Sequence, residues 1–155
     1  MKRISALFLS LMFVALAPMG IPKPVRAEDA ATEVKYEDIT SENESRAQME
    51  LGTYGVYLLK GEAIIAETGS GKIAAGGSTS AAKKVNKITV GVRVQQKKNG
   101  TWYNYTTWSK TLTNTTYVST SKELTVPKGY YYRVLTTHSA QTDGSTSSTS
   151  GIWID

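Results

Sequence analysis

The sequence of 155 residues has no cysteine and a single histidine, His138. Without cysteine no disulfide can form, and one histidine cannot supply a tetrahedral zinc site with its usual ligands. A calcium loop would show clustered Asp and Asn side chains, whereas only Asp143 lies in the polar loop expected near the C-terminus. We therefore expect no metal ion and no other cofactor.

Long apolar runs are also absent, with one exception at the start of the chain. A basic start leads into a largely apolar run over residues 4–17, which is shorter than the ~18 residues that a membrane-spanning helix needs. Residues 25–27 (VRA) match the small-x-Ala pattern that signal peptidase cuts. The pattern predicts a signal peptide over residues 1–27, cleaved between Ala27 and Glu28, and an exported protein without a stable membrane anchor.

Export without disulfides indicates the source of the protein. Small secreted domains of animals usually depend on disulfides, because a small hydrophobic core alone is marginally stable. A small exported domain that folds without them is more typical of bacteria. We therefore expect secretion from a bacterial cell into its surroundings.

The excess of positive charge largely disappears with the signal peptide. The whole chain carries a formal net charge of +5, from 18 basic and 13 acidic residues. Four basic residues and no acidic residue lie within residues 1–27, so the expected mature chain has 14 basic and 13 acidic residues. Such a chain lacks the strong basic character that binding to a phosphate backbone requires, and we expect no nucleic-acid partner.

The remaining charge divides the mature chain in two. Residues 28–50 contain eight acidic and two basic side chains, and residues 51–155 contain five acidic and twelve basic ones. The acidic segment has few aromatic and β-branched residues, so it buries too little apolar surface to offset the entropy of ordering. We expect a flexible acidic leader over residues 28–50 and a single folded domain over residues 51–155.

The folded domain shows the period-two alternation of β-strands. Residues 88–96 (ITVGVRVQQ) place four Ile and Val side chains on one face, and Arg93 with polar residues on the other. Asn99 and Gly100 then favour a tight hairpin, because both residues accept a positive φ. Residues 101–110 (TWYNYTTWSK) form the expected returning strand.

Further strand-like runs follow at similar spacing. Lys60-Gly61 and Gly76-Gly77 predict breaks between them, and residues 141–151 are expected to be a polar loop before the last strand. The expected runs are 53–59, 63–67, 72–75, 117–121, 124–126, 130–137 and 152–154. About eight strands at this spacing predict an all-β fold, a single antiparallel β-sandwich of immunoglobulin-like or jelly-roll-like type.

Three consecutive tyrosines open the strand that starts at residue 130. Alternation sends Tyr130 and Tyr132 to one face of the sheet and Tyr131 and Arg133 to the other. Sandwich domains often fix the corner before such a strand with a tyrosine hydroxyl that bonds nearby backbone. Tyr130 or Tyr132 is the candidate for this role; the alternative is a packed tyrosine with its hydroxyl at the rim.

Motifs for nucleotide binding and catalysis are incomplete. Residues 68–74 (TGSGKIA) lack the spacing of a phosphate loop, and no strand–helix–strand unit surrounds them. His138 has no carboxylate within four residues to orient it as a base, although Glu62, Glu67 or Glu123 could reach it in the fold. We interpret His138 as a strand-end histidine bonded to backbone or water, and we expect no enzymatic activity; a hydrolase is the third and least favoured class of function.

A set of short motifs gives the chain a family resemblance. The most specific motif is GYYYRV, residues 129–134, with His138 downstream. The others, in chain order, are GSGKI (69–73), GST (77–79), the strand 90–94, Trp102, VSTSK (118–122) and GI (151–152). Over residues 51–155 these motifs resemble a family of small, uncharacterised secreted proteins of Gram-positive bacteria. The resemblance implies export and a β-fold, and it implies no activity and no functional residues.

Two classes of function remain, a binding module and a membrane-active effector. Both phenylalanines lie in the expected signal peptide, so every mature aromatic residue is Tyr or Trp, the types common at recognition surfaces. This composition favours a non-catalytic module that binds an extracellular polymer or protein. The alternative is a secreted, toxin-like effector that inserts strands into membranes. Only residues 86–110 offer a hairpin with the ~9–11 residues per strand that insertion requires.

The candidate binding surface is centred on the strand expected over residues 101–110. Strict alternation would place Trp102 on one face and Tyr103 and Tyr105 on the other. If Trp102 packs beside the core, the Tyr103/Tyr105 face is exposed to solvent, together with the outward Arg93 of the preceding strand. The alternative is that both faces are core and rim of the sandwich. The expected surface comprises Tyr103, Tyr105, Arg93, Tyr131 and Arg133.

Overall fold

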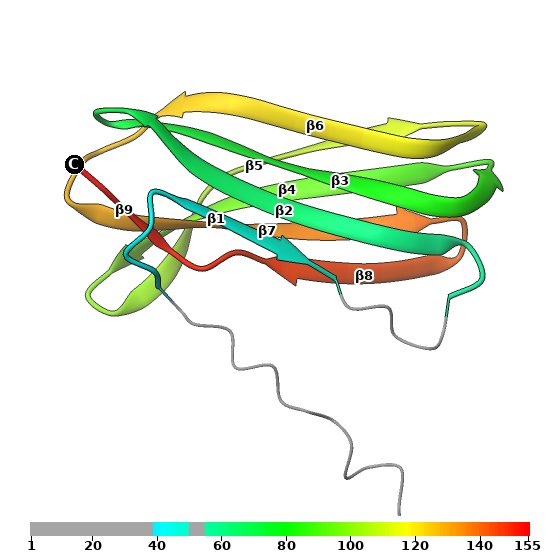
Figure 1. Ribbon diagram of the computed structural model, residues 1–155, viewed down its shortest axis with the longest axis horizontal. Coiled ribbons are helices and arrows are strands. Elements are labelled where there is room, and N and C mark those ends of the chain that lie inside the picture. Colours follow the sequence, from blue (N-terminus) through cyan, green and yellow to red (C-terminus); the bar gives the residue numbers. More distant parts are fainter. Residues whose placement is uncertain (1–38, 50–54) are drawn as a thin grey trace, which may run out of the picture. The chain divides into compact units, whose positions relative to one another are not determined.

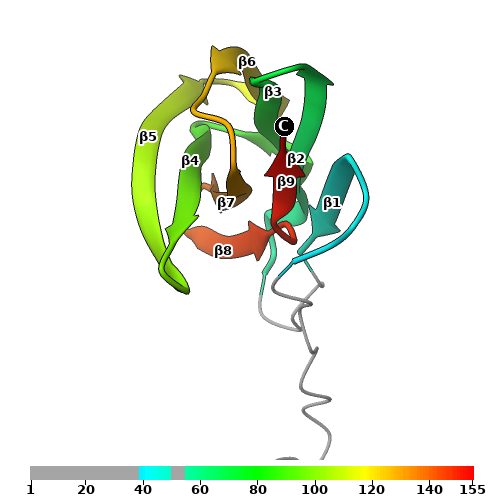
Figure 2. The same cartoon turned by 90° about the vertical axis from the view of Figure 1, so that its left-hand side faces the viewer.

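The computed structural model describes residues 39–49 and 55–155, which form nine β-strands. The strands are β1 (Glu44–Gln48), β2 (Leu58–Gly69), β3 (Lys72–Val85), β4 (Ile88–Lys98), β5 (Thr101–Leu112), β6 (Thr115–Thr125), β7 (Tyr130–Ala140), β8 (Asp143–Ser148) and β9 (Ile152–Ile154). One sheet has the order β1-β2-β3-β6, and the other has the order β5-β4-β7-β8, with β9 paired to β7. All these strand pairs are antiparallel, and the two sheets form two layers (Figure 1; Figure 2, seen from the strand ends). The predicted all-β antiparallel sandwich is confirmed.

The inward faces of the two sheets meet in a hydrophobic core. β4 contributes Ile88, Val90, Val92 and Val94, each at most 1% exposed, and β2 contributes the fully buried Ile65 from the other layer. Full burial of one such side chain stabilises a fold by about 1.5–3 kcal/mol. The alternation predicted for β4 is therefore confirmed, and this strand is a main source of core stability.

The predicted hairpin between β4 and β5 is also confirmed. Asn99 and Gly100 adopt φ angles of 49° and 79°, in the left-handed region that these two residue types accept. The two strands are 11 and 12 residues long and pair from Ile88↔Leu112 to Lys98↔Thr101. The hairpin is therefore longer than the sequence pattern predicts.

A β-bulge in β5 interrupts the pairing of this hairpin. Thr106 lies opposite Val94, but Asn104 lies opposite Gln95, so Tyr105 has no partner in β4. An extra residue inverts the alternation of side chains on one side of the bulge relative to the other. The predicted division of β5 into two regular faces is therefore wrong.

The bulge changes the positions of the aromatic side chains of β5. Trp102, expected beside the core, pairs with Lys97 and faces outward. Tyr103 and Tyr105 instead lie on the inner side of the sheet, where the rings of Tyr105 and Tyr132 meet edge to face at 5.8 Å. Because β5 is an edge strand, Tyr103 and Tyr105 are still 54% and 40% exposed.

Two strands continue through glycines at which the sequence predicts breaks. β2 passes through Gly61, and β3 passes through Gly76-Gly77. A Cβ atom at Gly61 would lie 2.4 Å from the ring of His138, and one at Gly77 would lie 2.6 Å from Cγ2 of Thr136. The predicted breaks are therefore wrong, because these glycines allow close approach inside the sandwich and do not turn the chain.

The polar loop predicted over residues 141–151 contains a strand. Residues 143–148 form β8, which pairs with β7 along its whole length. Ser147 of β8 is buried and hydrogen bonds to His138. Hydroxyl side chains serve here as partners for a buried polar group, which is why a segment rich in Ser and Thr belongs to the sheet.

Part of the predicted flexible leader is also a strand. Residues 44–48 form β1, which pairs with β2, and Ala47 packs against the core. Ser45 Oγ accepts a hydrogen bond of 3.0 Å from the backbone N of Ser150. The flexibility expected of these residues is therefore wrong, because backbone pairing to the edge of β2 stabilises a segment with few apolar side chains. The predicted signal peptide and the leader up to residue 38 lie outside the described residues.

Tyr132 confirms the predicted tyrosine corner. Its side chain is fully buried, and its hydroxyl donates to the carbonyl of Pro127 (2.7 Å) and accepts from Nε2 of Gln96 (2.6 Å). Burial raises the pKa of Tyr132 to about 12, so the hydroxyl keeps its proton at physiological pH. The neighbouring Tyr131 and Arg133 occupy the opposite face of β7, as the alternation predicts.

Candidate functional site

A hollow of about 650 Å³ crosses the outer face of the β5-β4-β7-β8 sheet. Three consecutive residues of each strand line it: 107–109 of β5, 91–93 of β4, 135–137 of β7 and 146–148 of β8. The strand registers place the middle residue of each triplet on the inner face and the two flanking residues on the outer face. We call this hollow and its flanking outward side chains the outer trough.

The outward side chains of the outer trough form two rows that run across the strands. The first, the Arg93 row, contains Arg93 between its cross-strand partners Thr107 and Leu135, and ends at Ser148 beside Leu135. Directly opposed residues of neighbouring strands have Cβ atoms about 5 Å apart. The row is therefore a continuous line of one guanidinium, one apolar side chain and two hydroxyls.

The second row, the Gly91 row, contains Gly91 between Ser109 and Thr137, and ends at Thr146 beside Thr137. A Cβ atom at Gly91 would lie 2.5 Å from Oγ1 of Thr137, so the glycine gives the Thr137 hydroxyl its space. The three hydroxyls of this row can each donate and accept hydrogen bonds. Together the two rows give the outer trough a surface suited to polar, hydroxyl-bearing ligands.

Aromatic side chains lie further along the same outer face, toward the β4–β5 hairpin. Arg133 lies over the ring of Trp102 with 4.3 Å between Cζ and the ring centroid, and Lys97 Nζ lies 5.3 Å from the same centroid. Tyr131 meets Trp153 edge to face at 5.0 Å, and Trp153 is 42% exposed. The outer face therefore combines a polar trough with flat rings whose orientation is set by their neighbours.

The structure separates the residues that the sequence nominates as a binding surface. Arg93, Tyr131 and Arg133 share the outer face of the sheet, whereas Tyr103 and Tyr105 lie on its inner side at the edge. The hydroxyls of the outer trough were not among the nominated residues. A signal for them exists in the sequence, because Ser and Thr recur at every second position in 107–109, 137–139 and 146–148.

The histidine lies on the inner side of the same sheet, within a cluster of hydroxyls. His138 is 2% exposed, and its Nδ1 lies 2.9 Å from Oγ1 of Thr79. Its Nε2 lies 2.8 Å from Oγ1 of Thr136 and 2.9 Å from Oγ of Ser147. Because the Thr79 hydroxyl donates to the carbonyl of Thr89 (3.1 Å), it accepts from Nδ1–H, and Nε2 of the imidazole is an acceptor.

This cluster keeps the imidazole neutral and satisfied inside the fold. Burial lowers the pKa of His138 to about 4, opposed by smaller effects of the Glu62 carboxylate and of a hydrogen bond to the Ser78 backbone. The contact between Ser147 and His138 has the length of a nucleophile–base pair, but the two side chains are only 4% and 2% exposed. The expectation of a strand-end histidine bonded to backbone or water is corrected, because hydroxyl side chains are its closest partners.

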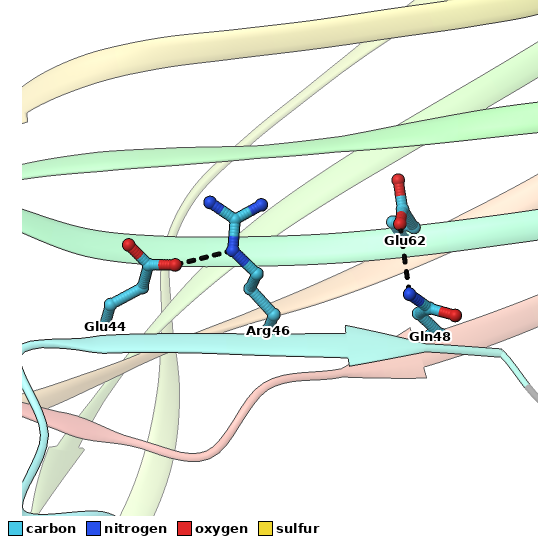
Figure 3. Close-up of polar contacts among 4 residues, drawn as sticks. All are labelled: Glu44, Arg46, Gln48 and Glu62. Atoms are coloured by element: carbon cyan, nitrogen blue, oxygen red, sulfur yellow. Dashed lines mark hydrogen bonds and ion pairs between the residues drawn. The ribbon is translucent and has the colours of Figure 1, made fainter.

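A second hollow, of about 240 Å³, lies on the outer face of the other sheet, around Glu62. Figure 3 shows Gln48 of β1 beside Glu62 of β2, and Arg46 beside Glu44 along β1. Glu62 accepts from Nε2 of Gln48 at 3.3 Å and pairs with Nζ of Lys60 at 2.7 Å. The hydrogen bond from Lys60 lowers the pKa of Glu62. The opposite charges neutralise each other within each strand, and the hydrogen bond from Gln48 to Glu62 connects β1 to β2.

Residues 39–49 and 55–155, which the structure describes, offer neither a metal centre nor a membrane-spanning helix. That part of the chain contains no group of three or more His, Cys, Asp and Glu side chains placed to hold a metal ion. It also contains no helix of the length and apolar character that crossing a bilayer would require.

The strands and the outer trough define the protein as an all-β, two-sheet sandwich with a polar concave face. The chain belongs to DUF6147, a family of unknown function, whose model matches residues 27–152. Membership of a family of unknown function agrees with the resemblance in the sequence motifs, and secretion and a Gram-positive source stay predictions. No curated protein and no solved structure matches the chain.

Proposed function

We propose that the protein is a secreted bacterial, non-catalytic binding module whose outer trough holds an extracellular glycan chain. The observation that carries this proposal is the pair of side-chain rows across β5-β4-β7-β8, which supply five hydroxyls and one guanidinium around a hollow of about 650 Å³. Sugar rings present hydroxyls on their edges and apolar C–H groups on their faces. The rows offer partners for the edges, and Leu135 offers a contact for a face.

The dimensions of the outer trough also suit an extended polymer. It crosses four neighbouring strands, and three strand spacings of about 4.8 Å give a length of about 14 Å. The hollow is open to solvent along the face, so a chain can enter sideways and extend beyond both ends. Trp153 lies on the same face and is 42% exposed, so its ring can stack on a further sugar unit.

Secretion is part of the same proposal. The family model begins to match at residue 27, the last residue of the signal peptide that the sequence predicts. A module released from a bacterial cell would meet glycans of its own envelope or of its surroundings. Export would place the outer trough where such polymers are found.

The geometry favours this function over a membrane-active effector. β4 lies between β5 and β7, and its inward Val90, Val92 and Val94 are at most 1% exposed. If the hairpin left the sandwich to insert into a bilayer, it would expose this whole face and the core beneath it. A liposome-leakage assay separates the two functions, since a binding module releases no dye from vesicles.

The proposal is tested by filling the outer trough. Thr137→Tyr places a ring over Gly91 on the exposed outer face, a pairing that sheets tolerate well. We expect the parent protein, purified after expression of the whole chain, to be retained on at least one of peptidoglycan, mucin, pectin and common neutral glucans. We expect Thr137→Tyr to reduce that retention about tenfold, because its ring occupies the space of the ligand.

The matched control is Ser119→Tyr, which places the same ring on the exposed outer face of β6, in the hollow of the other sheet. This variant should retain the parent's binding, and both variants should keep the parent's melting temperature. Retention of the parent on none of the materials, or equal retention by the two variants, would overturn the proposed function.

A further inference from the structure

We infer that the glycan held by the outer trough is acidic and that Arg93 binds its carboxylate. This inference rests on the proposed function and specifies the ligand of the same site. It follows from the distribution of charge on the two outer faces of the sandwich, and from the environment of each cation.

The outer face that carries the trough has an excess of positive charge. Among the described residues, the side chains that face outward from β5, β4, β7 and β8 include Arg93, Lys97 and Arg133 and no Asp or Glu. Asp143, the one acid in these strands, points to the other side, and its carboxylate accepts from the backbone N of Tyr57 (2.6 Å). Asp155, which follows β9, accepts a hydrogen bond from Nε1 of Trp153 (2.6 Å). The field over the trough therefore favours an anionic ligand.

The three cations differ in what they contact. Arg133 and Lys97 lie over the ring of Trp102, and Arg133 Nε also donates to Oε1 of Gln95 (2.9 Å). These cations hold the aromatic part of the face in place. Arg93 is exposed and makes no hydrogen bond or ion pair with the residues that the structure describes. Its guanidinium is thus the donor group of the trough that a ligand can use.

Among the residues that the structure describes, the outer face of the β1-β2-β3-β6 sheet around Glu62 does not have uncompensated positive charge of the kind found at the trough. There, Arg46 pairs with Glu44, and Lys60 pairs with Glu62 at 2.7 Å. Each of these two cations has an acidic partner two residues away on its own strand, so its charge is compensated within the protein. Arg93 is instead flanked across the strands by a hydroxyl and by Leu135, so compensation would come from the ligand.

The neighbours of Arg93 specify the kind of anion. A guanidinium matches a planar carboxylate with two parallel hydrogen bonds. Thr107 and Leu135 lie on either side of it, and the hydroxyls of the Gly91 row lie across the hollow. The outer trough thus offers one charged group, the Arg93 guanidinium, surrounded by side chains that can bind the neutral hydroxyls and C–H groups of a ligand. A chain of uronic acid units presents the same combination, whereas a polyphosphate would need several cations in line.

The test compares acidic polysaccharides with their own carboxyl-reduced forms. Polygalacturonate, alginate and hyaluronan are used, each before and after reduction of the carboxylate to an alcohol, in affinity electrophoresis with the parent protein. We expect at least one acidic polymer to bind about tenfold more tightly than its reduced form, since a charge-assisted pair accounts for a difference of this size. Arg93→Gln should abolish the difference while the melting temperature stays unchanged.

The control variant is Arg46→Gln, which removes a cation from the outer face of the other sheet and should keep the parent's preference. The inference is overturned if reduced and acidic forms bind equally, if Arg93→Gln keeps the preference, or if a phosphate polymer such as lipoteichoic acid binds more tightly than every uronate. In each of these cases the proposed function stands as long as Thr137→Tyr still weakens binding. Binding of none of the polymers would overturn both.

Discussion

Val92→Asp should prevent the protein from folding. Val92 is 1% exposed, at the centre of the inward face of β4 between β5 and β7. A carboxylate placed there would be desolvated among the apolar side chains of the core. An unpaired buried charge costs several kcal/mol, which is comparable to the total stability of about 5–15 kcal/mol that a domain of this size has. We expect far-ultraviolet circular dichroism without the signal of β-structure.

The neighbouring residue provides the control for this prediction. Arg93 lies one position further along β4 and is exposed on the outer face. Arg93→Ser should change the free energy of unfolding by no more than about 0.5 kcal/mol, measured by urea denaturation. Similar effects of the two substitutions would contradict the assignment of inner and outer faces on which the outer trough depends.

Lowering the pH from 6.5 to 4 should remove about 3 kcal/mol of stability through His138 alone. In the fold the pKa of this imidazole is about 4, below the value of about 6.5 for an unfolded chain. The unfolded state therefore binds a proton that the folded state does not. Neutral His138 therefore contributes fully to the free energy of unfolding above pH 6.5. This contribution is lost progressively as the pH falls to about 4, and each unit between the unfolded and folded pKa values corresponds to about 1.4 kcal/mol.

The single histidine makes this prediction easy to measure. The ring proton resonances of His138 titrate without overlap from another histidine, so NMR gives its pKa in the folded protein directly. We expect a midpoint near 4, and a midpoint near 6.5 would contradict the buried, hydroxyl-bonded site. Urea denaturation at a series of pH values should show a smaller loss between pH 6.5 and 4.5 for a folded His138→Gln variant than for the parent.

The sequence predicts those elements in which local pattern and fold agree. β4 alternates apolar and polar residues without interruption, and Asn99-Gly100 supplies the turn that follows it, so strand, face and hairpin are all as expected. Tyr132 is also as expected, because its hydroxyl bonds the backbone only five residues away, at Pro127. These features depend on interactions that are close in the sequence.

The features that the sequence does not predict depend on distant partners. The sequence predicts a strand break at Gly61, but this glycine lies within β2. The ring of His138, 77 residues later, occupies the space that a side chain at position 61 would need. Ser147 reads as part of a polar loop, but its hydroxyl bonds the same imidazole. Residues 44–48 read as flexible, but the edge of β2 provides their hydrogen bonds. No local window of sequence contains these partners.

The sequence predicts only those parts of the candidate site that follow the local alternation of a strand. Arg93, Tyr131 and Arg133 follow regular alternation in β4 and β7 and share the expected outer face. Tyr103 and Tyr105 do not lie on that outer face, because one extra residue in β5 inverts the alternation of its side chains. A bulge is a matter of register between two strands, and the composition of one strand does not reveal it.

The central claim is that the outer face of the β5-β4-β7-β8 sheet binds the ligand. The most direct test is a titration of the isotope-labelled protein with hexamers cut from the polysaccharide that the parent retains, followed by amide chemical shifts. We predict that the largest changes fall on residues 91–93, 107–109, 135–137 and 146–148, which line the outer trough. Changes centred on Glu62 and the outer face of β1-β2-β3-β6, or spread evenly over the protein, would contradict the claim.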